Sequence, residues 1–220
     1  MPEEIISGPL TRKDRISVVL YRTGIGISGL LMLLLGMVMY FIDIVKVSGG
    51  VRVASPFSGV SNSSGTLAPL SIGYGGIILI LLYLSAGLSV INIHLYIGWL
   101  KRFLKGLYFF SLFMLLILFL IGRGNPLYPL FEMPFTAFLL LPLGGVLAFI
   151  GAKEAYCFGL LEGYLFAIVF ILYICLWPML GNELKIYGLF ISSLLCLFLT
   201  LRKAVMPLSF DIGDKSKYIP

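Results

Sequence analysis

The sequence predicts an all-α membrane protein: a polytopic bundle of about six transmembrane helices, with both chain termini in the cytoplasm. Three observations support this fold class. The 220 residues are 60% hydrophobic and only 12% charged, whereas soluble domains carry about a quarter charged residues. The mean hydropathy is +1.05. The apolar residues also form long stretches, and the connections between these stretches contain most of the Lys and Arg residues.

A transmembrane helix needs about 20 mostly apolar residues to cross a hydrocarbon core of about 30 Å. The six stretches that meet this requirement are residues 24–45, 74–99, 103–121, 134–151, 155–177 and 186–205. The fourth stretch contains Pro142 beside two glycines. Because proline lacks a backbone donor, it kinks a helix, although neighbouring helices can satisfy the freed carbonyl in a membrane bundle. We therefore expect a kinked fourth span, with a re-entrant segment as the alternative.

The positions of the Lys and Arg residues predict the orientation, since cytoplasmic loops are enriched in both. Twelve of the sixteen lie on the side of the predicted bundle that holds both termini. The other four are Lys46, Arg52, Arg123 and Lys185. Both termini are therefore expected in the cytoplasm, or in the stroma if the membrane belongs to a plastid. An odd number of spans would spoil this segregation, and the net charge of +6 is an orientation signal, not a nucleic-acid-binding surface.

This topology divides the chain into three regions. Residues 1–23 form a basic cytoplasmic tail, either an ordinary flank of the first span or a short interfacial helix. Residues 24–205 form the transmembrane domain, and residues 206–220 form a cytoplasmic C-terminal tail. The start of the sequence does not resemble a signal peptide, because the first apolar stretch arrives after residue 20 and is long enough to span. The first span is expected to remain as an anchor.

Familiar cofactor motifs are weak in this sequence. Residues 24–29, Gly-Ile-Gly-Ile-Ser-Gly, match the dinucleotide-binding pattern, but that motif functions between a strand and a helix. A basic tail and a membrane span flank it here, so these glycines are interpreted as helix-packing positions. The three cysteines lack the spacing of metal ligands, and the single histidine excludes any site that needs two imidazoles from one chain.

Ionisable residues inside a membrane are informative, because each costs about 2.5–3.5 kcal/mol at the centre of a helix. His94 lies about 10 Å and Glu162 about 13 Å below the cytoplasmic ends of their predicted spans, at 1.5 Å per residue. The two side chains could therefore meet at a similar depth if their helices are neighbours. Glu154 and Cys157, one turn apart, would line the entrance above them.

Two interpretations of this predicted intramembrane site remain open. A carboxylate that is hydrogen-bonded to an imidazole can relay protons, or can orient a histidine that ligates a metal or pigment centre. In the second case His94 would bind a chlorophyll or a haem. The alternative is a protonated Glu162 and a neutral His94, each satisfied by backbone or hydroxyl groups of adjacent helices. Replacing Glu162 with Gln separates the two, because only a functional site predicts altered activity or complex formation.

Three stretches together carry a family resemblance. They are residues 91–104 (INIHLYIGWLKRFL), residues 153–158 (KEAYCF) and residues 211–216 (DIGDKS). In this combination the sequence resembles a family of uncharacterised integral membrane proteins of cyanobacteria and plastids, defined only as a domain of unknown function. The resemblance covers most of the chain and implies a photosynthetic lineage, with a location in a thylakoid, plasma or plastid membrane. It implies no activity.

The matching stretches also indicate which residues the family shares. They contain His94, Glu154 and Cys157, whereas Glu162 lies outside them. The charged residues of the third stretch are Asp211, Asp214 and Lys215. This C-terminal segment either docks a cytoplasmic or stromal partner or is a solvated terminus.

The leading expectation for function is non-enzymatic: an accessory protein that assembles, stabilises or regulates a larger membrane complex, which the resemblance implies is photosynthetic. Aromatic-rich apolar spans with few polar groups suit association between helices. The second class is a small transporter or a membrane-embedded enzyme that uses His94, Glu154 and Glu162. A polar cavity that opens to the cytoplasm and reaches these residues would favour this second class, and a dry packed bundle would favour the first.

Overall fold

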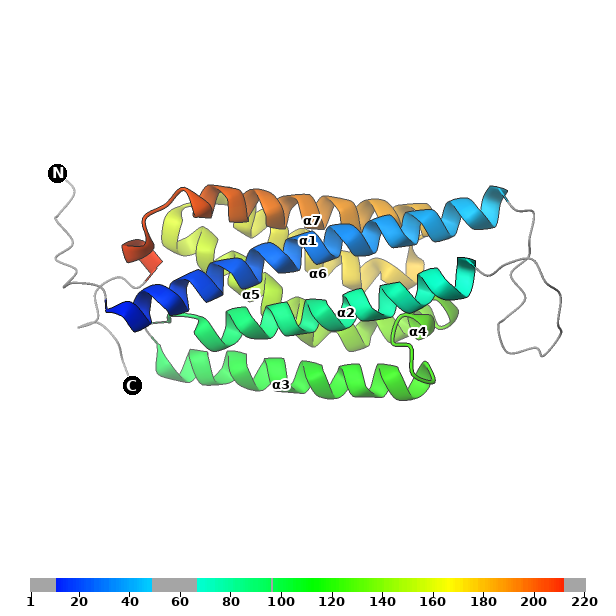
Figure 1. Ribbon diagram of the computed structural model, residues 1–220, viewed down its shortest axis with the longest axis horizontal. Coiled ribbons are helices and arrows are strands. Elements are labelled where there is room, and N and C mark those ends of the chain that lie inside the picture. The colour runs from blue at the N-terminus through cyan, green and yellow to red at the C-terminus, as the bar shows by residue number, and fades with distance from the viewer. Residues whose placement is uncertain (1–10, 49–66, 96, 212–220) are drawn as a thin grey trace.

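The computed structural model describes residues 11–48, 67–95 and 97–211, and this part of the chain is helical, without strands. In chain order the elements are α1 (Arg12–Ser48), α2 (Leu67–Asn92), α3 (Gly98–Ile121), α4 (Tyr128–Glu132), η1 (Pro134–Leu140), α5 (Leu141–Phe158), α6 (Leu161–Leu176), η2 (Trp177–Met179), α7 (Asn182–Ala204) and η3 (Leu208–Asp211). Six of its helical segments are long and apolar enough to cross a membrane. The predicted all-α membrane bundle with six spans is therefore confirmed (Figure 1).

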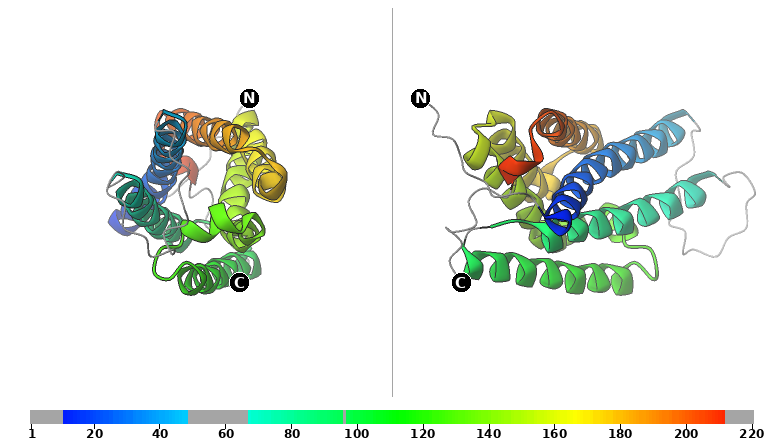
Figure 2. Two further views of the ribbon diagram at one scale, coloured as in Figure 1. Left: turned by 90° about the vertical axis from the view of Figure 1, so that its right-hand side faces the viewer. Right: turned by 60° about the vertical axis from the view of Figure 1, so that its left-hand side comes forward.

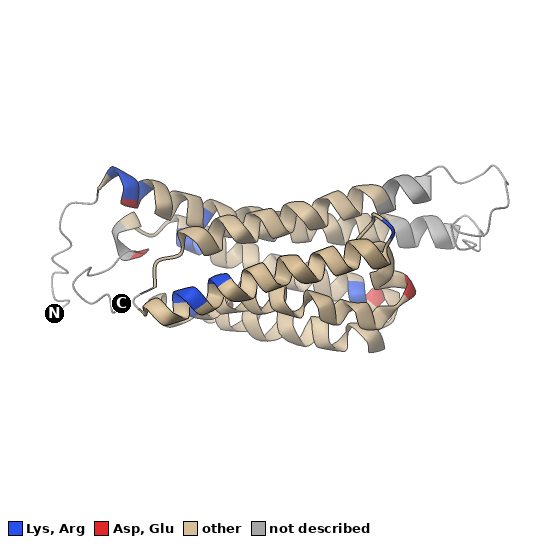
Figure 3. Ribbon diagram, turned by 90° about the horizontal axis from the view of Figure 1, so that it is seen from below, with Lys and Arg blue, Asp and Glu red and all other residues tan. Residues whose placement is uncertain are grey.

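The six spans stand side by side and close into a ring (Figure 2). Helix α1 packs mainly against α2 and α7, α6 packs between α5 and α7, and α3 packs against α5 and contacts α2. The buried apolar core fills the centre of this ring and draws side chains from all six spans. Charged residues lie toward the two ends of the bundle, and its middle is uncharged (Figure 3).

The start of the first helix and the end of the last helix lie at the same end of the bundle. There α1 begins, α2 is linked to α3, α5 turns into α6, and α7 ends. We call this end the basic end, because it holds most of the described Lys and Arg residues. The other end of the bundle contains α4, η1 and η2, and we call it the opposite end.

Helix α1 begins twelve residues before the predicted start of the first span. A capping box sets this start: the Thr11 backbone N–H donates to Asp14 Oδ2 at 3.2 Å, and the Asp14 N–H donates to Thr11 Oγ1 at 3.3 Å. Such reciprocal bonds satisfy two donors that a helix start leaves unpaired. The basic segment is therefore continuous with the span instead of forming a separate interfacial helix. With 37 residues and about 1.5 Å per residue, α1 is longer than a membrane core.

The glycines of the dinucleotide-like pattern lie where α1 packs closely against its neighbours. A Cβ atom at Gly24 would collide with the Ser89 hydroxyl and lie 2.9 Å from the Ser85 carbonyl oxygen on α2. At Gly29 it would lie 3.2 Å from Cys196 Sγ on α7. Small residues let helix backbones approach in this way, so their interpretation as packing positions agrees with the structure.

Two predicted helix ends were wrong, and both lie at the basic end. Helix α2 ends at Asn92 instead of residue 99, because Ile93 and Leu95 turn into the core in a non-helical link that leads to Gly98. Helix α5 continues to Phe158, beyond the predicted turn at residues 152–154. It ends where Gly159 adopts φ +65° and donates its N–H to the Ala155 carbonyl, a left-handed cap that glycine tolerates best.

The fourth span begins as a 3₁₀ segment, η1, and continues as α5. Pro142 lies in the first turn of α5, where the missing N–H would have no intrahelical partner in any case. The predicted irregularity near Pro142 is therefore a change of helix type, and the whole segment from Pro134 to Phe158 remains a candidate span.

Candidate functional site

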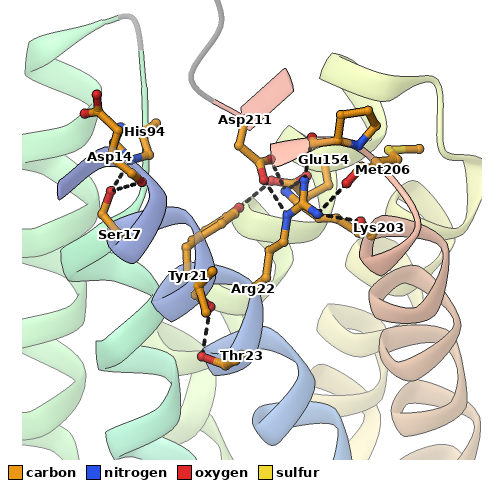
Figure 4. Close-up of polar contacts among 12 residues, drawn as sticks. Asp14, Ser17, Tyr21, Arg22, Thr23, His94, Glu154, Lys203, Met206 and Asp211 are labelled. Carbon is orange, nitrogen blue, oxygen red and sulfur yellow. Dashed lines mark hydrogen bonds and ion pairs between the residues drawn. The ribbon is translucent and has the colours of Figure 1, made fainter. Parts of the chain in front are cut away.

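A group of ionisable side chains is buried at the basic end, where α1, α5, α7 and η3 converge (Figure 4). We call it the charge cluster. Its members are Tyr21 and Arg22 of α1, Lys153 and Glu154 of α5, Lys203 of α7, and Asp211 of η3. Helix α5 delivers Glu154 to this position because it continues to Phe158, so that the carboxylate points into the bundle instead of lying in a loop.

Glu154 is the centre of the charge cluster and is 0% exposed. Its Oε1 accepts hydrogen bonds from the Tyr21 hydroxyl and from Lys153 Nζ, the latter at 2.8 Å. Its Oε2 pairs with Lys203 Nζ. Buried carboxylates are retained when cations and hydrogen bonds compensate their lost hydration, and here both oxygens have such partners.

Asp211 joins the last helix to the first. Lys203 Nζ lies 2.7 Å from Asp211 Oδ1, and Arg22 Nε donates to Asp211 Oδ2 at 2.6 Å. The Arg22 guanidinium also donates to the carbonyl oxygens of Lys203, Met206 and Pro207 at 3.0, 2.7 and 3.0 Å. The last carbonyls of a helix have no intrahelical donors, so Arg22 caps the end of α7 and holds η3 against α1.

Aromatic rings contact the ammonium groups of the two lysines in the charge cluster. Lys203 Nζ lies 4.6 Å and Lys153 Nζ 5.0 Å from the centre of the Tyr21 ring, and Lys203 Nζ lies 5.0 Å from the centre of the Phe158 ring. Cation–π contacts at such distances contribute about 0.5–2 kcal/mol each. The lysines are therefore held by rings as well as by carboxylates.

Of the residues predicted for the intramembrane site, Glu154 is the one that the structure places in the charge cluster, and Asp211, predicted for partner docking, belongs to it as well. Cys157 follows it by about one turn of α5, but its side chain is exposed. Glu162 lies in the first turn of α6, where its Oε1 accepts from Arg202 Nη1 at 2.5 Å. The predicted order of depth is thus reversed, because the turn falls at Gly159: Glu154 lies deep and Glu162 lies near the helix start.

His94 lies in the link between α2 and α3, not inside a span. Its Nε2 is 2.8 Å from Ser17 Oγ. The Ser17 hydroxyl donates its only proton to the Asp14 carbonyl oxygen at 3.0 Å, so the arrangement that satisfies both contacts has His94 Nε2–H donating to Ser17. His94 and Glu162, which could have met if their helices were neighbours, bond to different partners: His94 contacts Ser17 of α1, and Glu162 accepts from Arg202 of α7.

The environment of His94 lowers its pKa from the ordinary value of 6.5. The largest cause is burial, which disfavours the charged ring. The cations of Lys101 and Lys153 add to it, and the carboxylates of Asp14 and Asp211 oppose it in part. The ring is therefore held in its neutral form near neutral pH.

Reasoning from the sequence missed four members of the charge cluster: Tyr21, Arg22, Lys153 and Lys203. Its three basic residues look like flanks of spans, and their count was used only for orientation. One available signal was the third family stretch, which begins at Asp211. The other two charged residues predicted for partner docking, Asp214 and Lys215, lie outside the described residues.

Comparison with known proteins agrees with this architecture. No curated protein and no solved structure matches the chain. A model of the uncharacterised integral membrane protein family DUF2301 matches residues 88–219. The matched segment covers more than half of the chain, includes five of the six spans at least in part, and contains Lys153, Glu154, Lys203 and Asp211 of the charge cluster. The chain is therefore a multi-pass integral membrane protein that belongs to the DUF2301 family.

Proposed function

We propose that this protein is a non-enzymatic accessory factor that assembles or stabilises a larger membrane complex. The observation that carries the proposal is that the charged groups of the charge cluster bind chiefly to one another and to backbone carbonyls. Both carboxylates are held by cations, and Arg22 is held by Asp211 and three backbone carbonyls. Such bonding suits a clamp between helices, whereas a catalytic or transport site presents groups to a substrate.

The interior of the ring supports the same conclusion. Its central void has a volume of about 50 Å³ and is lined by apolar and aromatic side chains, such as Met32, Leu79 and Phe170. The buried serines of α1 and α2 bond to one another or to backbone, as Ser28 does with Ser85 at 2.8 Å. Transported ions and polar substrates need polar groups along their path, whereas the walls of this void are apolar.

The outer surface offers a large apolar area for association. Helix α3 is the least buried of the six spans. Its exposed rings are Trp99, Phe103, Phe109, Phe110 and Phe113. Large rings on an open span suit packing against helices of a partner. The partner that the family resemblance implies is a photosynthetic complex, in a thylakoid, plasma or plastid membrane.

Purification in a mild detergent, followed by a native gel, tests the proposal. The tagged protein is expected to migrate with a complex much larger than its own 24.3 kDa. The double substitution F109A/F113A on α3 should reduce this co-migration, while Y40A/F41A, which removes two exposed rings from α1, should leave it unchanged. Migration of the wild-type protein only as a small species would overturn the proposal.

A transporter or membrane-embedded enzyme remains the alternative, because buried ionisable groups in membranes often mark functional sites. Glu154 would be its centre, with Cys157, Glu162 and His94 at greater distance along the basic end. A polar substrate that reduces the labelling of Cys157 by a thiol reagent would favour this alternative.

A chlorophyll or haem at His94 is a further alternative. His94 Nε2 is bonded to Ser17, so ligation would have to use the other ring nitrogen. The absorption spectrum of the purified protein tests this directly: a Soret band that is lost in His94→Gln would support a bound pigment or haem.

A further inference from the structure

A pocket of about 480 Å³ opens between α1 and α7, next to the charge cluster. Its walls are apolar and include Ile25, Ile27, Leu199 and Leu208. Gly26 on its wall lets α1 approach α7 closely, since a Cβ there would lie 3.0 Å from Thr200 Cγ2. Ile27 at the rim is 44% exposed on the outer face of the ring, so the pocket is open to the surrounding lipid.

Two cations of the charge cluster, Arg22 and Lys203, also line this pocket. Lysine has three N–H donors and arginine has five. The Lys203 ammonium pairs with Glu154 and Asp211 and lies against the Tyr21 and Phe158 rings. The Arg22 guanidinium uses four of its donors, on Asp211 and three carbonyls. Arg22 therefore has one N–H without a hydrogen-bond partner among the described residues, while the buried Lys203 contributes its charge.

The charge of the cluster also favours an anion. Its three cations, Arg22, Lys153 and Lys203, contact two carboxylates, those of Glu154 and Asp211. One positive charge thus remains in excess among groups that contact each other in an apolar environment. Basic pockets between transmembrane helices bind the head groups of anionic lipids.

Along the helix axes, the charged and apolar parts of the pocket follow the order of the head group and the acyl chain of a membrane lipid. Lys203 lies one residue before the end of α7, and the end of a membrane-spanning helix is expected near a membrane boundary. Ile27 follows Arg22 by five residues along α1, which places the apolar part of the pocket about 7 Å deeper in the membrane. A head group near the basic end would therefore continue into a hydrocarbon chain along α1 and α7.

We propose that this pocket binds one acyl chain of an anionic phospholipid, with its phosphate against the N–H of Arg22 that has no partner among the described residues. The proposal does not depend on the accessory role above, because the pocket and its charges belong to a single chain. A lipid in this position would join α1 to α7 and complete the charge balance of the cluster.

Native mass spectrometry of the delipidated protein, with added phosphatidylglycerol or phosphatidylcholine, tests the proposal. One phosphatidylglycerol per chain is expected to remain bound at a collision energy that removes phosphatidylcholine, and only phosphatidylglycerol should raise the Tm. Equal retention of both lipids would overturn the proposal, because it would leave an apolar pocket without a site for an anion.

Two matched substitutions locate the site. Ala204→Trp fills the pocket from α7, and the affinity of this variant for phosphatidylglycerol should be lower than that of the wild type by about tenfold or more. Leu201→Trp, at an exposed position of α7 that does not line the pocket, should bind as the wild type does. Equal weakening by both would overturn the location. If Ala204→Trp fails to fold, Thr23→Phe fills the same pocket from α1.

One further variant tests whether a carboxylate of the chain, instead of a lipid phosphate, supplies the negative charge that balances the cluster. If the carboxylate of Asp214 balanced the cluster, Asp214→Asn would strengthen the binding of phosphatidylglycerol and lower the Tm of the lipid-free protein. The proposal predicts that Asp214→Asn changes neither quantity, and a change in both would overturn it.

Discussion

Charged residues at the basic end are expected to contribute unequally to the free energy of unfolding, because their side chains are buried to different degrees. Glu154 has a side chain that is fully buried between two lysines. The Glu162 side chain is 12% exposed and pairs with Arg202, whose side chain is 50% exposed. Water and salt screen such exposed pairs, whereas a charge that loses its partner in the interior is not compensated. Two glutamates eight positions apart are therefore expected to respond differently to the same change.

Glu154→Gln is expected to lower the free energy of unfolding by about 3–5 kcal/mol, because it leaves two buried lysines with a single carboxylate. Glu162→Gln is the matched control, with an expected loss of about 1 kcal/mol or less. Thermal unfolding in detergent measures both. Equal Tm values for the two variants would contradict the central role of Glu154.

His94 is expected to make stability dependent on pH. Its pKa is lower in the folded protein than in the unfolded chain, where it is about 6.5. The unfolded chain therefore binds the proton more readily, so the contribution of His94 is complete above the unfolded value and is lost as the pH falls through it. The Tm should decrease between about pH 7.5 and about pH 5.5. In His94→Gln this decrease should be smaller, and an identical decrease would contradict the assignment.

At the scale of elements, the turn between α5 and α6 decides which residues reach the charge cluster. Gly159 has a φ of +65°, and its left-handed conformation ends α5 after Phe158. A turn six residues earlier would remove Glu154 from the helix that carries it into the bundle. The position of one glycine thus determines which of two glutamates becomes the buried one.

Gly159→Ala is expected to destabilise the protein by about 1–2 kcal/mol, since a Cβ disfavours the left-handed conformation. Gly106→Ala, in the middle of α3, is the opposite control and should stabilise by about 0.5–1 kcal/mol, because glycine weakens a helix interior. A Cβ would meet no atom within 4 Å at either position, so backbone conformation alone separates them. Unfolding midpoints of the two variants check the sign of each effect.

At the scale of the whole molecule, the distribution of charge predicts the orientation in the membrane. The basic end contains the start of α1, the α2–α3 link and the end of α7. The opposite end contains Lys46, Arg123 and Lys185 among the described residues. Because Lys and Arg are retained on the cytoplasmic side, the basic end is expected to face the cytoplasm.

Reporter fusions measure this orientation. Alkaline phosphatase fused after Gly124, at the opposite end, should be active, and the same enzyme fused after Lys105, close to the α2–α3 link, should be inactive. Green fluorescent protein at the same two positions should give the reverse pattern. The reverse result for both reporters would place the termini outside the cytoplasm.

The sequence by itself determined the class of this protein and the number of its spans. Both depend on local properties: the length of an apolar stretch must match the thickness of a membrane, and a span can be recognised without knowledge of its neighbours. The glycine pattern in α1 was also interpreted correctly, because its context excluded a strand before it.

Only the tertiary structure decided where helices end and which polar groups meet. The turn at Gly159 and the end of α2 at Asn92 lie inside stretches whose composition is compatible with several boundaries. The bond between Tyr21 and Glu154 joins positions 133 residues apart, and that between Arg22 and Asp211 joins positions 189 residues apart. A buried charge is stable only beside its partners, and partners so distant in the chain become neighbours only when the ring of helices closes.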